Sequence, residues 1–493
     1  MTAHTGAQGV PAQWAALEQR QVPAWFHDAK LGIFVHWGLY SVPAWAPRVD
    51  HINAIIAKRG AHGLYRANPY SEWYLNSYRV PGSPSAKHHR DTYGDLNYYE
   101  FAKEFNTEAA QADLAGFARN MRAAGAEYVV LTSKHHDGFT LWPSEVAHPQ
   151  GRALHAQRDL VGELGEAVRT EGMRMGLYYS GGYDWSVHDV VLRRLADALL
   201  AMPPQPAYER YATAHVRELI ERYRPSVLWN DIGWPGGGDL SALFTAYYEA
   251  VPDGVVNDRW SESPTRRGPL NTLATRVGGR LIELLWPLVP RSLKKVGFPL
   301  PRHSDFATPE YQTFDEVRDD KWEQTRGIGH SFAHNRNEHA EDMIEIEDLI
   351  HGFVDVVSKN GNVLLGVGPA ADGTIPEPQQ RVLDGLGAWL RVNGEAIKST
   401  RPWHVAEGRT DRGTALRLTQ SRGAVNAIML DRAPVAGQHV LEQFTTSTLP
   451  RKVEVLGCGE VPYRLVDGRL AVDLPERLPD SPAHTVRVTG SCP

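Results

Sequence analysis

The sequence predicts an α/β fold, with a (β/α)8-like barrel over residues 1–398 followed by a C-terminal antiparallel β-sandwich over residues 399–493. Short apolar runs alternate with amphipathic stretches through most of the chain, which indicates parallel strands joined by helical crossovers. Polar or aromatic residues recur at the ends of these runs, as they do on the catalytic face of barrel enzymes. A chain of 493 residues is also too long for one ordinary core, which favours two domains.

Strands and helices are predicted in the order that a parallel sheet requires. The strands are short β-branched or aromatic runs that end at Gly or Pro turns. The helices have apolar residues at helical spacing, a cap at residues 106–107 and stops at Gly125 and Gly172. The predicted strands cover residues 31–36, 127–132, 173–180, 227–229, 254–257 and 362–366, and the predicted helices cover 107–124, 160–170, 208–223, 240–251, 343–358 and 378–392.

A closed barrel explains the placement of polar residues better than an open doubly wound sheet. The residues at or just after strand ends are His36, His135, His136, Tyr178, Asp231 and Arg259. In a barrel these ends converge on one face, whereas an open sheet gathers its site near a switch point. The sequence has no GxGxxG opening a helix and no P-loop, so no nucleotide cofactor is expected.

The pattern of apolar and polar residues changes near Trp403. Short alternating runs follow, separated by Gly, Pro and Asp, and this pattern is typical of an antiparallel β-sandwich. The runs cover residues 415–419, 426–430, 452–456, 470–474 and 485–489. They carry few candidate catalytic groups, so we expect a supporting domain.

Composition restricts the function classes. Hydrophobic residues make up 42% of the chain and charged residues 22%, as in globular proteins. A net charge of −6 gives no sign of nucleic-acid binding, and no run reaches the ~18 apolar residues of a transmembrane span. The first residues show no secretory signal, and the two cysteines, Cys458 and Cys492, are expected to be free thiols. These observations predict a cytoplasmic protein.

Asp231 is the strongest single candidate for chemistry. It ends a predicted strand between Trp229 and Trp234. A carboxylate between large aromatic rings suits sugar chemistry, because the rings can stack on a pyranose while the carboxylate reaches the anomeric carbon. The alternative is that Asp231 only caps a turn or the next helix.

The candidate binding residues also have structural interpretations. His135 and His136 are poor metal ligands, because adjacent strand residues point to opposite sides and no third ligand is suitably spaced. They would instead donate hydrogen bonds to substrate hydroxyls or lie satisfied in the core, and the same holds for His36. Glu72 beside Trp73 has the composition of a hydroxyl-binding carboxylate with a stacking ring, although a solvated loop glutamate is commoner.

Glycoside hydrolysis normally needs a second carboxylate. Residue types and spacing do not choose among the candidates after Asp231, which are Asp258, Asp305, Glu310, Glu323 and Glu338. Ser-His-Asp chemistry has no nucleophile elbow here, and Cys458 lies in the wrong domain for a thiol mechanism.

Several ordered motifs together resemble the α-L-fucosidases of glycoside hydrolase family 29. The resemblance runs from about residue 25 to residue 392 and continues more weakly through the sandwich. The motifs are WFHDAKLGIFVHWG (25–38), SEWY (71–74), TSKHHDGF (132–139), YYSGGYDW (178–185), LWNDIGWP (228–235), VNDRW (256–260), TPEY (308–311) and KWEQTRGIGHSF (321–332).

The resemblance implies a retaining exo-α-L-fucosidase that acts on fucosylated oligosaccharides or glycoconjugates without a metal or other cofactor. Asp231 would be the nucleophile and Glu310 the acid/base, although the family varies in where its acid/base lies. The carboxyl groups of a retaining pair should lie about 5–5.5 Å apart. An apolar ring, Phe332 or Trp229, would pack on the fucose methyl group. The fucose-binding residues would be His36, Glu72, Trp73, His135, His136, Tyr178, Trp229, Arg259 and Phe332.

Two rival functions remain open at this point. One is an exo-glycosidase for a related sugar such as an α-L-galactoside. The other is a fucose-binding protein without catalysis, which is disfavoured because both Asp231 and Glu310 are present. Association into a homo-oligomer is left open.

One segment departs from the family pattern, an insertion at about residues 265–302. It contains the apolar run LIELLW (281–286) and the basic residues Arg276, Arg280, Arg291, Lys294 and Lys295. A basic amphipathic helix is typical of a membrane surface or an anionic partner. The favoured alternative is a helix packed over the barrel rim or against another subunit. The loop over residues 47–70 also looks extended.

Overall fold

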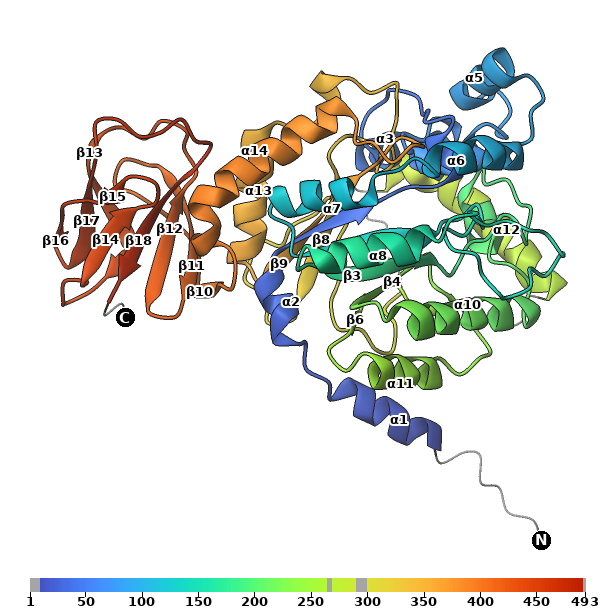
Figure 1. The fold of residues 1–493 in the computed structure, drawn as a ribbon, viewed down its shortest axis with the longest axis horizontal. Helices are drawn as coiled ribbons and strands as arrows, with labels where there is room; N and C mark the ends of the chain where they lie inside the picture. The colour runs from blue at the N-terminus through green and yellow to red at the C-terminus, as the bar shows by residue number, and fades with distance from the viewer. Residues whose placement is uncertain (1–8, 264–267, 290–298, 491–493) are drawn as a thin grey trace, which may run out of the picture.

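The computed structural model describes residues 9–263, 268–289 and 299–490, so Arg291, Lys294, Lys295 and Cys492 lie outside the described residues. A parallel sheet in the order β6-β4-β3-β2-β1-β9-β8 forms the centre of the larger domain (Figure 1). Its strands are β1 (Leu31–Val35), β2 (Tyr128–Lys134), β3 (Arg174–Ser180), β4 (Val227–Asp231), β6 (Val255–Val256), β8 (Trp322–Gly327) and β9 (Gly361–Val367).

A short extended segment at residues 305–307 joins the two edge strands of this sheet. Phe306 pairs in parallel with Asn257, next to β6, and Ala307 pairs in parallel with Trp322 of β8. The sheet therefore curls into a closed circuit, and the predicted (β/α)8-like barrel is confirmed. The joining segment is too short and too polar to be predicted as a strand.

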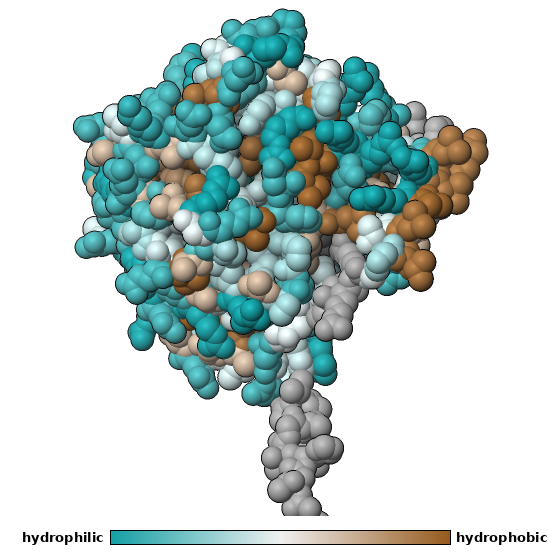
Figure 2. Space-filling view, turned by 90° about the vertical axis from the view of Figure 1, so that its right-hand side faces the viewer, coloured by the Kyte–Doolittle hydropathy of each residue, from teal (hydrophilic) through white to brown (hydrophobic). Residues whose placement is uncertain are grey.

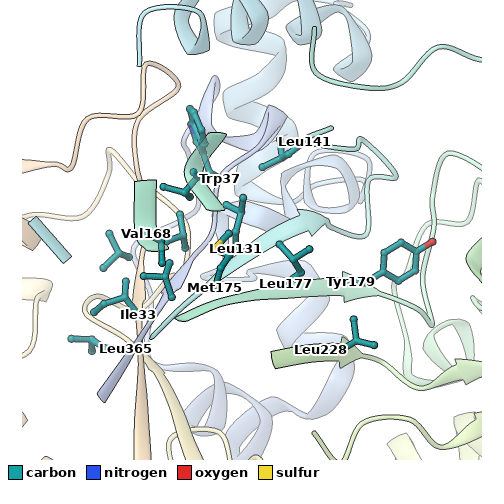
Figure 3. Close-up of a cluster of buried hydrophobic side chains, with 14 of the residues drawn as sticks. Ile33, Trp37, Leu131, Leu141, Val168, Met175, Leu177, Tyr179, Leu228 and Leu365 are labelled. Atoms are coloured by element: carbon teal, nitrogen blue, oxygen red, sulfur yellow. The ribbon is translucent and has the colours of Figure 1, made fainter. Parts of the chain in front are cut away.

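Helices cover the outside of the barrel (Figure 1). Those of the crossovers are α7 (Leu114–Ala123), α8 (Leu160–Thr170), α10 (Ala207–Tyr223), α11 (Leu240–Ala250) and α13 (Ile346–Ser358), and α14 (Glu377–Asn393) follows the last strand. Figure 3 shows part of the core between the two layers, with Ile33, Leu131, Leu177 and Leu228 on four neighbouring strands and Val168 on α8. Burial of these side chains holds the helices on the sheet.

The alternate residues of the same strands point into the barrel. Phe34, Val130, Tyr178 and Trp229 form part of this second, separate cluster. Because side chains alternate along a strand, Asp231 lies on the same inward face as Trp229, one layer closer to the carboxyl end of β4. The packed barrel interior thus forms the floor beneath Asp231.

One predicted helix is wrong. Residues 107–124 form the end of α6 (Phe101–Ala109) and then α7, not a continuous helix. Thr107 lies inside α6, where its hydroxyl donates to the Lys103 carbonyl at 2.9 Å. Asp113 is the real cap, since its carboxylate accepts a hydrogen bond from Gly116 N at 2.8 Å.

The C-terminal domain has two antiparallel sheets packed around Trp403, Leu418 and Val486. The first contains β10 (Arg401–Arg409), β11 (Ala415–Ser421), β12 (Ala424–Met429), β18 (His484–Thr489), β14 (Lys452–Val455) and β15 (Gly459–Glu460), and the second contains β13 (Gly437–Thr445), β17 (Arg469–Leu474) and β16 (Tyr463–Val466). This domain packs on α13 and α14 (Figure 1), where Trp389 Nε1 donates to the Ala483 carbonyl at 3.0 Å.

The remaining elements are short or lie in the loops between strands and helices. Those used below are α3 (Ile52–Arg66), α9 (Leu195–Leu200), α12 (Pro269–Leu285), η2 (Ser71–Trp73) and η4 (Trp286–Leu288). The others are α1 (Gly9–Glu18), α2 (Ala24–Ala29), α4 (Tyr74–Ser77), α5 (Pro84–Tyr93), η1 (Leu39–Ser41), η3 (Tyr98–Glu100), η6 (Ala340–Asp342), η7 (Gly394–Ala396), β5 (Trp234–Pro235) and β7 (Glu262–Ser263). No helix within the described residues has the length and apolar character needed to span a bilayer.

Candidate active site

The candidate residues meet at the carboxyl end of the barrel strands. Asp231 is the last residue of β4, and Tyr178 lies in β3. His36, His135, His136, Arg259 and Phe332 stand in the loops that follow β1, β2, β6 and β8. Glu72 and Trp73 belong to η2, and Glu310 follows the segment that closes the barrel. Eight segments of the chain therefore contribute to one site.

Asp231 is held by three donors. Arg259 Nη1 lies 2.9 Å from Asp231 Oδ1, the Tyr178 hydroxyl donates to Oδ2 at 3.0 Å, and Ile232 N donates to Oδ1 at 2.9 Å. The cap of the next helix is Asp239, whose carboxylate accepts from Ala242 N at 2.9 Å. The interpretation of Asp231 as a helix cap is therefore wrong.

Glu310 lies on the other side of the same guanidinium. Arg259 Nη2 is 3.3 Å from Glu310 Oε2, and the Tyr70 hydroxyl donates to Oε1 at 2.7 Å. The Glu310 side chain is 29% exposed, against 13% for Asp231. One carboxylate thus lies deep in the barrel mouth while the other faces its opening.

Arg259 is fixed independently of the two carboxylates. Its Nε donates to Thr308 Oγ1 at 3.1 Å, and its guanidinium carbon lies 4.8 Å from the centre of the Trp229 ring. Burial opposes the positive charge, but Asp231 and Glu310 outweigh this effect, so the pKa of Arg259 is raised. The site therefore contains a permanent cation between two carboxylates.

The three histidines are neutral at physiological pH because they are buried. Burial lowers the pKa of His36 to about 3 and that of His136 to about 4, and it lowers the pKa of His135 well below its usual range. Neutral imidazoles have one donor and one acceptor nitrogen each, which suits hydroxyl binding. Among the described residues, His135 Nδ1 has no hydrogen-bond partner although it is buried.

The two adjacent histidines do not point to opposite sides, so that sequence-based expectation is wrong. The ring centroids of His135 and His136 are only 4.0 Å apart. The pairing register between β2 and β3 shifts between Thr132 and Lys134, which interrupts the regular pleat just before these residues. His136 Nε2 comes within 4.0 Å of Asp231 Oδ2.

Glu72 is not a solvated loop residue. It is 2% exposed, and its Oε2 accepts hydrogen bonds from the Ser331 hydroxyl at 3.0 Å and from Ala333 N at 3.1 Å. Burial raises the pKa of Glu72 to about 7, although these hydrogen bonds favour its charged form. Glu72 therefore joins η2 to the loop after β8.

Three aromatic residues frame the site in different ways. Trp73 packs edge-on against His136 with ring centroids 5.1 Å apart, and Phe332 stacks on His36 at 5.1 Å. Trp229 is 2% exposed and stacks on Tyr178 at 5.6 Å. Trp229 is therefore part of the floor, whereas Trp73 and Phe332 belong to the walls.

The other four carboxylates considered for the second catalytic role have structural partners. Asp258 accepts from Thr308 N at 3.1 Å, and Asp305 accepts from the Tyr248 hydroxyl and from Val256 N, both at 2.7 Å. Glu323 accepts from Trp229 Nε1 at 3.2 Å below the floor, and Glu338 accepts from Ser331 N at 3.0 Å. Within the described part of the chain, no three His, Cys, Asp or Glu side chains are grouped as metal ligands.

Two residues of the site were not predicted from the sequence. Tyr70 donates to Glu310, and Thr308 holds Arg259. Tyr70 directly precedes the SEWY motif and Thr308 begins the TPEY motif. Both residues lie in or beside motifs that carry charged site residues, and this position was the feature of the sequence that could have identified them.

Comparisons of the whole sequence with known proteins identify its family. The family model described as α-L-fucosidase matches residues 1–287 and 294–395. Human tissue α-L-fucosidase is 31% identical over 97% of this chain and 91% of its own length. An α-L-fucosidase of Dictyostelium discoideum is 31% identical over 80% of this chain and 75% of its own length.

Solved structures give the same result. A Thermotoga maritima α-fucosidase in complex with fucose is 37% identical, with a TM-score of 0.78 over 97% of this chain and 99% of that one. A Thermotoga maritima α-L-fucosynthase in complex with α-L-Fuc-(1-2)-β-L-Fuc-N3 is also 37% identical, with a TM-score of 0.80 over 97% of this chain and 98% of that one. The chain belongs to the α-L-fucosidase family.

Proposed function

We propose that this α-L-fucosidase is an exo-acting enzyme that removes terminal fucose with retention of configuration, through a covalent fucosyl-enzyme. The observation that carries the proposal is the contact of one guanidinium, that of Arg259, with both Asp231 and Glu310. A retaining glycosidase needs two carboxyl groups close together, one to attack the anomeric carbon and one to transfer protons.

In the first step, Asp231 attacks C1 while protonated Glu310 gives its proton to the departing oxygen. The three donors around Asp231 hold its carboxylate in one orientation, so that little reorganisation accompanies the attack. The greater exposure of Glu310 suits its role, because the leaving group must extend from the site toward solvent.

In the second step, Glu310 removes a proton from water, which hydrolyses the fucosyl-enzyme. Arg259 contacts both carboxyl groups, so it still holds Glu310 in place after Asp231 is esterified. The acid of the first step is thereby positioned to act as the base of the second.

The walls of the site support a fucosyl group as the sugar. His36, His135 and His136 are neutral and offer hydrogen-bonding nitrogens to hydroxyl groups. Phe332 offers an apolar ring to the methyl group at C5, where other hexoses carry a hydroxymethyl group. One such difference contributes only ~1–3 kcal/mol to discrimination, so some activity on an α-L-galactoside is expected.

The test is hydrolysis of an aryl α-L-fucoside by wild type, Asp231→Gly and Glu310→Ala. We expect Asp231→Gly to lose nearly all activity and to form β-L-fucosyl azide when azide is added, since azide occupies the space of the missing carboxylate. Glu310→Ala should lose activity mainly on substrates with poor leaving groups, which need protonation most. Asp305→Asn, which changes a buried carboxylate away from Arg259, is the matched control and should stay active.

Three outcomes would contradict the proposal. An α-configured azide product would exclude attack by Asp231 on C1. Full activity of Glu310→Ala on poor leaving groups would place the acid elsewhere, first at Glu72. Activity on other glycosides but not on fucosides would leave the fold unchanged and exclude the proposed sugar. The cytoplasmic location and the action on fucosylated oligosaccharides or glycoconjugates stay predictions.

A further inference from the structure

The helix of the insertion exposes an apolar face to solvent. Leu270, Leu273, Val277, Leu281 and Leu284 of α12 and Leu288 of η4, called the apolar stripe below, are each at least half exposed, and Leu270 reaches 81%. Their spacing of three or four residues places them on one side of the helix. Figure 2 shows hydrophobic side chains, coloured brown, gathered at the right-hand edge of the molecule in that view. Exposed apolar patches of this kind usually mark interaction surfaces.

The opposite face of α12 already holds the helix on the protein. Gly279 lies against Ala196 of α9, where a Cβ would come within 2.8 Å of the alanine Cβ. Glu283 Oε1 accepts a hydrogen bond from Leu195 N at 2.8 Å, and Trp286 Nε1 donates to the Ile56 carbonyl of α3 at 2.9 Å. The favoured prediction of a helix on the barrel rim thus agrees with the packing, yet its apolar face remains uncovered.

The charge around the apolar stripe is positive. Arg276 and Arg280 flank it on one side of the helix. α12 contains these two arginines and one acidic residue, Glu283. Glu283 faces α9 and is bonded there. The natural complement of this surface is an apolar layer bounded by negative charge.

A second copy of the chain is a poorer complement. If a twofold axis paired two stripes antiparallel, the same flank of each helix would face itself. Arg276 and Arg280 would then approach their own copies, and α12 has no acidic residue on the exposed face to pair with them.

We propose that the apolar stripe binds the surface of an anionic lipid bilayer, with its leucines in the interfacial layer and Arg276 and Arg280 beside the headgroups. α12 packs on α3, and Tyr65 of α3 stacks on Trp73 of the site at 6.1 Å, so α3 connects the helix of the stripe to the wall of the active site. Binding would hold the active-site rim beside the lipid surface.

The test is sedimentation of the purified protein with vesicles of phosphatidylcholine alone or mixed with phosphatidylserine. We expect binding to the mixed vesicles that weakens as salt is added. Leu273→Asn/Val277→Asn/Leu281→Asn should reduce binding at least ~10-fold, since three apolar side chains leave the interface. Arg276→Gln/Arg280→Gln should reduce it about fivefold for each arginine removed.

The matched control places asparagine at two exposed apolar positions of the sandwich. Val435 and Leu449 are 65% and 57% exposed, so Val435→Asn/Leu449→Asn should bind vesicles like wild type. Hydrolysis of a soluble aryl fucoside and the melting temperature report whether each variant is folded. Binding is measured without turnover, so its result is independent of the catalytic mechanism proposed above.

Two results would overturn the proposal. Wild type that stays in solution with mixed vesicles at low salt would show that the stripe does not bind anionic lipid. Wild type that is dimeric in sedimentation velocity, with the triple asparagine variant monomeric, would show that a second copy covers the stripe.

Discussion

Replacement of Glu323 by glutamine tests the electrostatics of the barrel interior. Glu323 is fully buried in β8 and accepts hydrogen bonds from the Tyr128 hydroxyl and from Trp229 Nε1. Burial raises the pKa of Glu323 to about 7, and the two hydrogen bonds offset the effect only in part. Glutamine has the same shape, so its oxygen can accept from Trp229 while its amide donates to the Tyr128 oxygen.

The direction in which Glu323 changes the unfolding free energy with pH follows from proton binding. The pKa of Glu323 is about 7 in the folded protein and 4.5 at its ordinary value, so between these values the unfolded chain binds fewer protons. The stabilisation that Glu323 gives in its protonated form is complete below pH 4.5 and is lost as the pH rises to about 7. At ~1.36 kcal/mol per pKa unit, the loss between pH 5 and pH 8 is about 2–3 kcal/mol. Glu323→Gln avoids this loss because glutamine does not titrate.

The assay is urea unfolding of wild type and Glu323→Gln at pH 5, 6, 7 and 8. The difference in unfolding free energy between the two proteins should shift by about 2–3 kcal/mol in favour of the variant across this range, because other groups titrate in both proteins and cancel. Glu166→Gln makes the same replacement on an exposed helix face and is the matched control. A constant difference for Glu323→Gln, or one that moves in favour of wild type as the pH rises, would refute the reasoning.

Three further predictions concern the site and its support. Arg259→Lys should lower kcat/KM on an aryl α-L-fucoside by about 100-fold or more, because an ammonium group cannot bridge Asp231 and Glu310 as the planar guanidinium does. Tyr178→Phe removes one donor to Asp231 and should lower kcat/KM about tenfold in the same assay, equivalent to a hydrogen bond of ~1.5 kcal/mol. Lys134→Met leaves Asp184 buried without its ion-pair partner at 2.9 Å and should destabilise the protein by about 3–5 kcal/mol in urea unfolding. Lys134→Met with Asp184→Asn removes the charge but keeps an oxygen that accepts from Ser186 N and Val187 N, so it should recover most of that loss.

The strands that are apolar on both faces were predictable, and β8 was not. Residues 31–36, 127–132 and 173–180 show β-branched or aromatic runs, because they bury one face against helices and the other inside the barrel. β8 has the sequence WEQTRG, which no apolar pattern marks as a strand. Its Glu323 is tolerated only because Tyr128 and Trp229, far away in the chain, supply donors. Such partners are a property of the closed barrel and do not appear in local sequence.

In the site, too, features that depend on local sequence were predictable and features that depend on distant residues were not. The position of Asp231 at a strand end followed from a short apolar run and a turn, which are local features. Glu310 was indicated by resemblance alone, because its relation to Asp231 depends on Arg259 and on Tyr70, which lies 240 residues away in sequence. The shared direction of His135 and His136 depends on an irregularity in strand pairing, which a regular pleat model cannot predict.

Burial at the barrel mouth determines where charge resides. It keeps His36 and His136 neutral, and it raises the pKa of Glu72 to about 7 and that of Glu338 to about 8. Asp231 and Glu310 each contact the guanidinium of Arg259. A neutral sugar therefore meets walls that offer hydrogen bonds with little net charge. The ionic contacts of the site are made by the two carboxyl groups that the proposed reaction uses. Positive charge that develops on the sugar in the transition state would therefore interact with these groups rather than with the walls.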